Sequence, residues 1–442
     1  MMIRVADMAW ISKSVLSEHR IDLLKSILTF FTLGERSDPR KVTLYKDGDS
    51  FFGVPRAWFL KNIDKFEDIG YFIDDLGGRD VDLRFNGELR DYQVKSVNRF
   101  NELYNDDLCL GGVWQASPGW GKTVVALKMV SESRTNTLIV VNKEFLLDQW
   151  SERIEQFLPD AKVGIIHGDR CEYKNTDVSI ALVQTLNSRE KSYPSDFWGR
   201  FGMVITDEAH HVSAPTWMSV VPRFNCRFHV ALTATPYRKD RADRCFFDNI
   251  GDIVYKSEFR QLKATLKRVI LDTHLSSPHM KTAPRAVQIN DICLDHNRNK
   301  RIVSELMKAL MGGRKIIVLS ERRNHLDVLR SGSIQAFKSI GKTSGFYIGG
   351  MKQDDLDLSA KCDVVFATYQ MAQEALDIKE LDTAFFVTPV GDIEQAVGRI
   401  QRVCEGKKSP LVVDFVDKNI KSFEGSYAKR MIFYRSRGMI NE

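Results

Sequence analysis

The segment Ala116-Ser117-Pro118-Gly119-Trp120-Gly121-Lys122-Thr123 decides the fold, because it joins an apolar strand ending near Gln115 to a helix over residues 123–130. Its two glycines let the backbone curl so that N–H groups point at phosphate oxygens. The lysine supplies a positive charge for the β- and γ-phosphates of a nucleotide, and the threonine a hydroxyl for Mg²⁺. The segment therefore predicts an ATP site that contains Ser117, Pro118, Gly119, Trp120, Gly121, Lys122 and Thr123.

A pair of carboxylates, Asp207 and Glu208, follows the apolar run 203–206. The carboxyl end of a strand is where a parallel sheet presents ligand-binding groups. We expect Asp207 to hold Mg²⁺, directly or through water, and Glu208 to position and deprotonate the attacking water. His210, two residues further on, is expected to link the nucleotide state to the next element.

Two small hydroxyl residues, Thr233 and Thr235, follow at the end of another apolar run in Leu232-Thr233-Ala234-Thr235-Pro236. Such hydroxyls can exchange hydrogen bonds with the acidic pair. We therefore expect them to relay the nucleotide state.

Apolar runs of four to six residues recur along the chain between helical spacers. Such runs indicate strands covered on both faces, as in a parallel α/β sheet. They are expected at 137–141, 178–183, 203–206, 229–233, 315–319, 363–368, 383–387 and 411–415. The series breaks between about 258 and 300, in a basic, irregular stretch interpreted as a link between two sheets.

The first 86 residues have a different pattern, that of a small α+β unit. Residues 17–31 place Ile21, Leu24, Ile27, Leu28 and Phe31 on one helical face. Residues 42–45 and 51–54 read as two strands around the turn 46–49. A second helix is expected from Pro55-Arg56, and a linker near residue 80.

These patterns predict an α/β protein with two tandem parallel-sheet lobes and a small N-terminal α+β domain. The expected boundaries are 1–86 for the accessory, nucleic-acid substrate domain, 87–258 for the ATP-binding lobe, 259–299 for a basic linker and 300–442 for the second lobe.

Composition excludes several classes of protein. The chain has 442 residues, 43% apolar and 28% charged, without the roughly 18-residue apolar run that spans a bilayer. The N-terminus lacks the pattern of a secretion signal. The seven scattered cysteines suggest no metal site or disulfide framework and fit a reducing cytoplasm. We therefore expect a cytoplasmic protein.

The positive charge is clustered. Residues 260–323 hold fourteen Lys or Arg against five Asp or Glu, and residues 396–442 hold ten against five. Clustered positive charge is typical of surfaces that bind phosphate backbones, although solvated helix faces would give the same count.

With these motifs the chain resembles the superfamily 2 helicases from about Leu89 to Phe415, which implies two RecA-like lobes. Leu89-Arg90-Asp91-Tyr92-Gln93 resembles the adenine-reading segment of the family, which assigns Arg90 and Gln93 to the nucleotide. The resemblance assigns four residues to the nucleic-acid backbone: Lys143, Gln184, Thr185 and Thr368. Glu374-Ala375-Leu376-Asp377-Ile378 resembles motif V and places Asp377 near the nucleotide.

The segment 395–402 matches the arginine-finger motif of the family at Gln395, Gly398, Arg399 and Arg402. A guanidinium that reaches across a cleft can stabilise charge on the transferring phosphoryl group. The two arginines are three residues apart, which predicts that they share one helix face.

The order of motifs is most similar to the DNA-directed branch that includes UvsW-type phage helicases and XPB-like translocases. That resemblance implies an ATP- and Mg²⁺-dependent DNA helicase that unwinds or branch-migrates forks and junctions in replication, recombination or repair. The alternatives are a double-strand translocase that remodels protein–DNA complexes, an RNA helicase, and an ATP-gated nucleic-acid sensor.

The implied partners are DNA forks, four-way junctions and single-strand tracts, with RNA and other replication or recombination proteins left open. A monomer in the host cytoplasm and no membrane are expected. Phe346, Tyr347 and Phe433 are candidates for a strand-separating wedge, against the commoner alternative of core aromatics.

Overall fold

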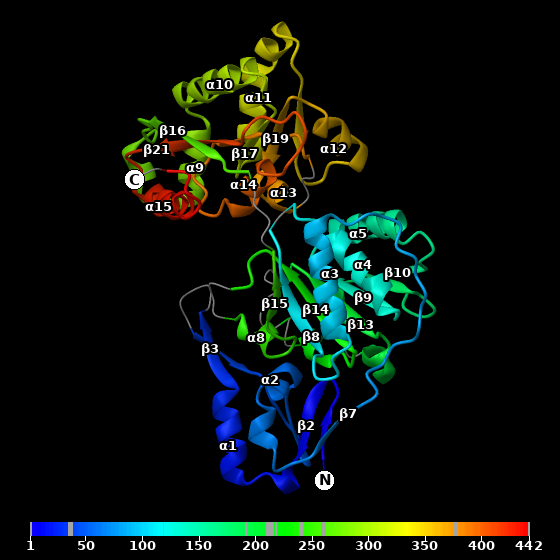
Figure 1. Cartoon of the computed structure of the whole chain (residues 1–442). Helices are drawn as coiled ribbons and strands as arrows, with labels where there is room; N and C mark the ends of the chain where they lie inside the picture. The colour runs from blue at the N-terminus through cyan, green and yellow to red at the C-terminus, as the bar shows by residue number, and fades with distance from the viewer. Residues whose placement is uncertain are drawn as a thin grey trace. The chain divides into compact units, whose positions relative to one another are not determined.

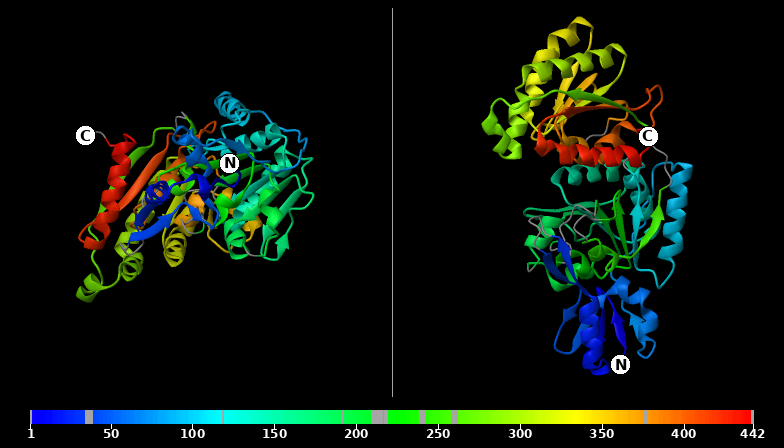
Figure 2. Two further views of the ribbon diagram at one scale, coloured as in Figure 1. Left: turned by 90° about the horizontal axis from the view of Figure 1, so that it is seen from below. Right: turned by 90° about the vertical axis from the view of Figure 1, so that its left-hand side faces the viewer.

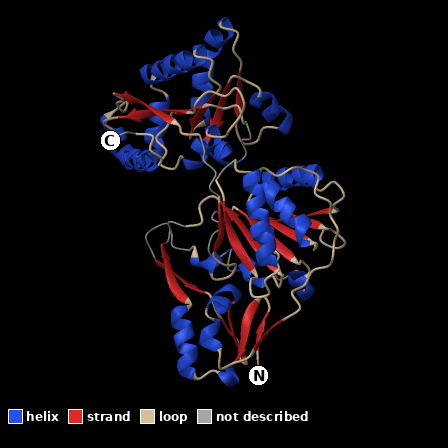
Figure 3. Ribbon diagram, in the orientation of Figure 1, coloured by secondary structure: helices blue, strands red, loops and turns tan. Residues whose placement is uncertain are grey.

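The computed structural model of the protein divides into two compact units, Met1–Phe259 and Arg260–Glu442 (Figure 1). The structure describes residues 2–33, 39–117, 119–190, 192–208, 216, 219–237, 242–257, 262–374 and 378–440. In both units helices flank a sheet (Figure 3).

The first unit begins with a small α+β domain whose five-stranded sheet has the order β5-β6-β2-β1-β7. Its strands are β1 (Ile3–Val5), β2 (Met8–Ser12), β5 (Lys46–Asp47), β6 (Phe51–Pro55) and β7 (Tyr71–Ile73). One face packs against α1 (Glu18–Ile27), α2 (Arg56–Lys61) and the 3-10 turn η2 (Ile63–Phe66). The predicted α+β fold of this region is confirmed.

The helix expected over residues 17–31 ends at Ile27, where the Thr29 hydroxyl donates to the Lys25 carbonyl. The next residues form β3 (Thr29–Leu33), which pairs with β4 (Pro39–Thr43). They are β-branched and aromatic, and pairing with β4 satisfies their backbone groups. Phe31, expected on the helical face with Leu24, is therefore 61% exposed on a strand.

The two strands expected at residues 42–45 and 51–54 do not pair with each other around the turn expected at residues 46–49. Its first two residues form β5 and pair with β6, while residues 39–43 pair with β3.

The larger part of the first unit is an eight-stranded sheet with the order β11-β10-β12-β9-β13-β14-β8-β15. All described neighbours run parallel except β10 and β11. The strands are β8 (Gly111–Gln115), β9 (Thr137–Val141), β10 (Val163–His167), β11 (Arg170–Cys171), β12 (Val178–Leu182), β13 (Met203–Asp207), β14 (Phe228–Thr233) and β15 (Ile253–Lys256).

Helices cover both faces of this sheet, as Figure 2 shows. Alternate residues of β9 enter two different cores: Ile139 and Val141 on one face, Leu138 and Val140 on the other. Burial on both faces explains why the central strands are continuous apolar runs. The described helices are α3 (Asp91–Tyr104), α4 (Lys122–Ser133), α5 (Glu144–Phe157), α6 (Val183–Ser188), α8 (Arg244–Phe247), and the 3-10 turns η3 (Ser195–Gly199) and η5 (Val221–Arg223).

The second unit contains a six-stranded parallel sheet with the order β16-β21-β20-β17-β19-β18. Its strands are β16 (Thr265–Leu271), β17 (Ile316–Ser320), β18 (Ser344–Tyr347), β19 (Val364–Thr368), β20 (Thr383–Phe386) and β21 (Leu411–Asp417). The described helices are α9 (Arg285–Cys293), α10 (His296–Met311), α11 (Arg323–Ser339), α12 (Gln353–Ala360), α13 (Tyr369–Glu374), α14 (Glu394–Ile400) and α15 (Lys421–Ser436), with the turn η6 (Pro278–Thr282). The predicted pair of RecA-like parallel sheets is thus confirmed.

The stretch 259–299, expected to be an irregular link, contains regular elements of the second sheet instead. β16 pairs with β21 over seven residues, from Thr265 opposite Leu411 to Leu271 opposite Asp417. β16 is an edge strand whose exposed positions include Lys267 and Arg268, so its sequence lacks a continuous apolar run.

A buried ion pair fixes α10 to the end of β21. The Arg298 guanidinium donates to both carboxylate oxygens of Asp417, at 2.7 and 3.0 Å, and both side chains are almost fully buried. Thr273 donates to the same carboxylate at 2.6 Å. This pair joins three separate segments of the unit.

Replacement of Arg298 by Ala is expected to lower the free energy of unfolding by about 3–5 kcal/mol, because Asp417 would stay buried without its counter-charge. Urea unfolding measures this change. Lys300→Ala, an exposed site on the same helix, is the control; equal effects of the two substitutions would contradict the assignment.

Candidate ATP-binding site

The phosphate loop lies between β8 and α4, as expected. Gly119 and Gly121 have left-handed backbones, with φ of 81° and 95°. A Cβ atom on Gly121 would lie 2.4 Å from Nε2 of Gln93, so a side chain there would also meet a neighbouring amide. The close approach and the backbone both require glycine at this position.

The register of three neighbouring strands brings the acidic pair to this loop. Asp207 of β13 lies opposite Leu232 of β14, and Thr233 of β14 lies opposite Gln115 of β8. The carboxyl ends of β8, β14 and β13 therefore meet at one edge. The ammonium of Lys122 reaches the Glu208 carboxylate there, with Nζ 2.8 Å from Oε1.

The Asp207 carboxylate is buried and held by two donors. Trp150 Nε1 donates to it at 3.0 Å, and the backbone N–H of Glu208 at 2.9 Å. Burial raises the pKa of Asp207 to about 6, the Glu208 charge adds to this, and Lys122 opposes it. Glu208 has φ of 46°, a conformation that is costly for a residue with a Cβ and that often marks functional sites.

These groups fit a magnesium–nucleotide complex. Two adjacent carboxylates, one with a raised pKa, would be stabilised by a divalent cation, and Thr123 adds a hydroxyl from the first turn of α4. No group of three His, Cys, Asp or Glu side chains suited to a metal occurs among the described residues. Magnesium does not need one, because it usually binds one or two carboxylates together with phosphate oxygens and water.

Gln93 contacts the phosphate loop. Its Nε2 donates to the Trp120 carbonyl at 3.1 Å, and its Oε1 accepts from the Arg90 backbone at 3.0 Å. Arg90 itself donates to the Tyr92 hydroxyl. Gln93 thus supports the loop, and the proposed adenine contact of Arg90 and Gln93 stays a prediction.

Sequence reasoning did not anticipate three neighbours of the loop. One of them is Trp150. The second is Tyr255, whose ring centre lies 5.7 Å from that of Trp120 in the loop. The third is Ser257, whose hydroxyl accepts a hydrogen bond from the backbone N–H of Ser117. Tyr255 belongs to the edge strand β15, and Ser257 follows that strand.

Of the coupling residues, Thr233 ends β14, the neighbour of the acidic strand β13, and Thr235 follows that strand. The Thr233 hydroxyl accepts from the Thr235 backbone at 3.1 Å. Between β13 and β14, Thr206 and the buried His229 share a hydrogen bond of 2.9 Å. Burial lowers the pKa of His229 well below its usual value, so the ring is neutral. Pro118, His210 and Asp377 lie outside the described residues.

The expected nucleic-acid residues of the first unit lie just beyond strand ends. Lys143 is the N-cap of α5, directly after β9, and Thr185 is buried in α6, after β12. Gln184 donates to the Asn142 carbonyl at 3.0 Å and so links these two ends. Thr368 ends β19 in the second unit. Their contacts with nucleic acid stay predictions.

The arginine motif of the second unit differs from expectation in one respect. Gln395 and Arg399 lie on α14, and Arg399 Nε donates to the Ala372 carbonyl at 3.1 Å. Arg402, predicted on the same helix face, follows the end of α14 instead. The helix ends because Gln401 is bonded to Leu262 through both its backbone and its side chain.

The three wedge candidates are not freely exposed rings. Tyr347 is buried in the second unit. Phe346 packs against one hydrophobic core of the second unit, and the Arg330 guanidinium lies over its ring. Phe433 packs against another core, and the Arg437 guanidinium lies over its ring.

Two RecA-like sheets, a phosphate loop and an acidic pair at adjoining strand ends define a P-loop ATPase. None of the described helices combines the length and apolar character that crossing a bilayer requires. Residues 86–238 match the family described as Type III restriction enzyme, res subunit.

Viral and archaeal proteins are similar to this chain. A protein of Acanthamoeba polyphaga mimivirus, provisionally named an ATP-dependent RNA helicase, is 26% identical over 97% of this chain and 84% of its own. A provisionally named helicase of Escherichia phage T5 is 25% identical over 75% of this chain and 73% of its own. The DNA 3′-5′ translocase XPB2 of Sulfurisphaera tokodaii is 32% identical over 40% of this chain and 37% of its own. The crystal structure of T4 UvsW covers 99% of this chain and 98% of its own with a TM-score of 0.43 and 15% identity.

The matching family model and these relatives support a superfamily 2 helicase. The resemblance inferred from the motifs is thereby confirmed, and ATP is the nucleotide that this class uses.

Replacement of Gly121 by Ala is expected to weaken ATP binding at least about tenfold, because the added Cβ meets Gln93 and the left-handed backbone becomes strained. Titration with a fluorescent ATP analogue measures the dissociation constant. Gly332→Ala on α11, where a Cβ meets nothing within 4 Å, is the control. An unchanged dissociation constant in Gly121→Ala would show that the loop does not hold the nucleotide.

Proposed function

We propose that the chain is a DNA-directed motor that hydrolyses ATP and unwinds or branch-migrates forked and junction DNA. The observation that carries the enzymatic part is the meeting of Lys122, Asp207 and Glu208 at one sheet edge beside the phosphate loop. The DNA-directed part is supported by the similarity to an archaeal DNA translocase and by the order of the motifs.

Each residue of this edge has a separate role. Lys122 leaves Glu208 and binds the β- and γ-phosphates, because the phosphates carry more negative charge than one carboxylate. Glu208 is then released to orient a water molecule and accept its proton as the water oxygen attacks the γ-phosphorus. Asp207 and Thr123 would hold Mg²⁺, which would supply charge neutralisation on the phosphates.

The second unit contributes Arg399 and Arg402 when the two lobes close around the nucleotide, with Gln395 as their neighbour. Their guanidinium groups stabilise charge on the transferring phosphoryl group. Closure on binding and opening after hydrolysis would move a nucleic-acid strand held by backbone contacts, among them Lys143, Thr185 and Thr368. Such contacts make binding insensitive to sequence and sensitive to salt.

Glu208→Gln is expected to lower ATP turnover about 10²–10⁴-fold while ATP binding is kept, because the amide cannot accept the proton of water. Steady-state turnover and nucleotide titration separate the two effects. Wild-type turnover in this variant would contradict the role of Glu208.

A second experiment tests the substrate. We expect forked and four-way DNA to stimulate ATP turnover, and to be unwound, more than single-stranded DNA or duplex RNA. Strand displacement by the wild type, with Glu208→Gln as the control, measures this. Preference for duplex RNA would instead support an RNA helicase, the activity named for the mimivirus relative, and ATP turnover without strand displacement would favour a translocase or a sensor.

A further inference from the structure

The outward face of the N-terminal sheet carries a row of basic and aromatic side chains. The strand register aligns Lys46, Gly53, Trp10, Arg4 and Phe72 across all five strands. Neighbouring residues along these strands enter the core of the domain instead: Ile3, Val5, Ala9, Ile11 and Phe52. The row therefore lies on the face opposite the core, where Phe72 is 43% exposed.

Trp10 is held flat on this face. Its six-membered ring covers Gly53, since a Cβ there would lie 2.8 Å from the ring. Its Nε1 donates to Asp7 at 2.8 Å. The ammonium of Lys46 lies 5.6 Å from the ring centre, within the range of a cation–π contact. The indole thus positions the cation.

The nucleotide-binding domain supplies a matching cation on the other side of a cavity of about 440 Å³. Arg4, Asp7 and Lys46 line it from the small domain, and Trp198 and Arg223 from the sheet domain. The Arg223 guanidinium lies 5.3 Å from the Trp198 ring centre. Each side of the cavity therefore presents a cation placed over a tryptophan.

The charged side chains that line the cavity are three cations, Arg4, Lys46 and Arg223, against two carboxylates, Asp7 and Asp196, and Asp196 is paired with Arg200. Arg4 pairs with Asp74 and Arg223 with Glu190, but Lys46 has no carboxylate within ion-pair distance in the part of the chain that the structure describes. Burial lowers the pKa of Lys46, Asp7 opposes this, and Arg223 lowers it further. An anion between the two cations would offset their repulsion.

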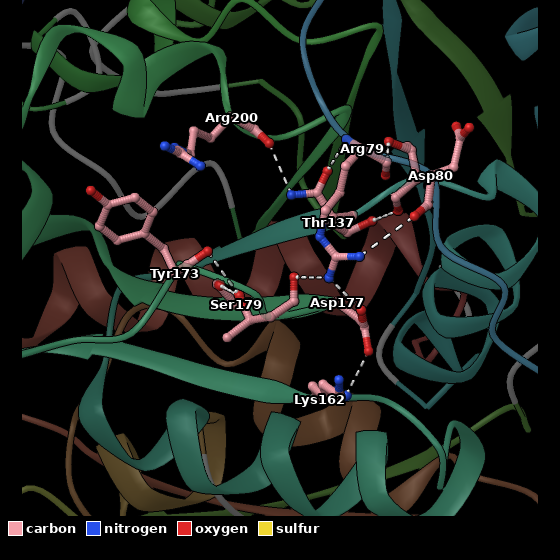
Figure 4. A network of polar contacts seen from close by, with 11 residues as sticks. Arg79, Asp80, Thr137, Lys162, Tyr173, Asp177, Ser179 and Arg200 are labelled. Atoms are coloured by element: carbon pink, nitrogen blue, oxygen red, sulfur yellow. Dashed lines mark hydrogen bonds and ion pairs between the residues drawn. The ribbon is translucent and has the colours of Figure 1, made fainter.

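The linker contacts the sheet domain through two glycines and through the polar network around Arg79 and Asp177 (Figure 4). Gly77 and Gly78 have left-handed backbones, and a Cβ on either would lie 2.5 Å or less from the backbone at Gly199 or Gly202. After them, the Arg79 guanidinium bonds the Asp177 carboxylate and the Thr176 carbonyl, and its backbone N–H donates to Asn136.

A second anchor, which is buried, joins the same domains. The Arg56 guanidinium is 3% exposed and donates to the carbonyls of Cys226 and Leu110, at 2.7 and 3.0 Å. With both anchors, the cavity is formed before any ligand arrives, so little conformational entropy is lost on binding.

The cavity is separate from the ATP site. Its sheet-domain residues lie in η3, which precedes β13, and in η5, which precedes β14. They are thus at the amino ends of these strands, whereas the phosphate loop and the acidic pair lie at the carboxyl ends.

We propose that this cavity binds a backbone phosphate of a single-stranded nucleic-acid segment, through Lys46 and Arg223, with Phe72 available to stack on a base. Phosphate contacts from basic side chains and stacking on exposed aromatic rings are the usual means of holding single strands. This inference rests on the proposed nucleic-acid motor. It adds a contact with nucleic acid to those predicted just beyond the strand ends of the two parallel sheets.

Lys46→Gln tests the proposal, with Lys65→Gln, an exposed lysine on the opposite side of the small domain, as the matched control. Fluorescence anisotropy with labelled single-stranded DNA and forked DNA is measured over a range of salt concentrations. Lys46→Gln is expected to weaken binding about three- to tenfold and to reduce the salt slope by about one, whereas Lys65→Gln stays within about twofold. ATP turnover without nucleic acid is unchanged in both.

Gly53→Ala gives a second readout, because the new Cβ displaces the Trp10 ring and with it Lys46. It is expected to weaken binding like Lys46→Gln, and its melting temperature reports whether it folds. Wild-type affinity in Lys46→Gln would overturn the cavity proposal while leaving the motor intact. Failure of the wild type to bind DNA or RNA would overturn the motor itself. If inorganic phosphate protects Lys46 from acylation and DNA does not, the occupant is a free anion. That result would also overturn the proposal.

Discussion

The ammonium of Lys122 and the carboxylate of Glu208 meet at 2.8 Å because three parallel strands end side by side. A parallel sheet places all its carboxyl ends at one edge, so residues far apart in the chain converge there without any contact of their own. A shift of one residue in the register of β13 would turn Asp207 to the other face and separate the acidic pair from the loop.

Burial makes this meeting useful for chemistry. Asp207 lies away from water, and burial raises its pKa because the charged carboxylate is poorly solvated. Glu208 is held in an unfavourable backbone conformation beside it. The surrounding sheet, whose central strands are covered on both faces, offsets both costs, as the proposed site for a cation and a phosphate requires.

The same sheet also carries the small N-terminal domain. Two left-handed glycines, the Arg79 network and the buried Arg56 join them across the amino ends of the strands. Because Arg56 is buried and most of these contacts involve backbone atoms, a movement of the sheet would carry the small domain with it. The proposed nucleotide site and the proposed nucleic-acid contact therefore lie at opposite ends of one sheet.

The sequence by itself determined the elements whose signal is local. The glycines and lysine of the phosphate loop, and apolar runs such as 137–141 and 203–206, predicted two parallel sheets and the strand ends that carry the acidic pair, because burial on both faces leaves a continuous apolar run. Features that depend on pairing with distant segments were decided only by the tertiary structure. β16 lacks an apolar run because it is an edge strand, Phe31 leaves its helix because β4 pairs with it, and α14 ends early because Gln401 bonds Leu262. The cavity over Trp10 likewise depends on strand register and domain contacts, which no local pattern records.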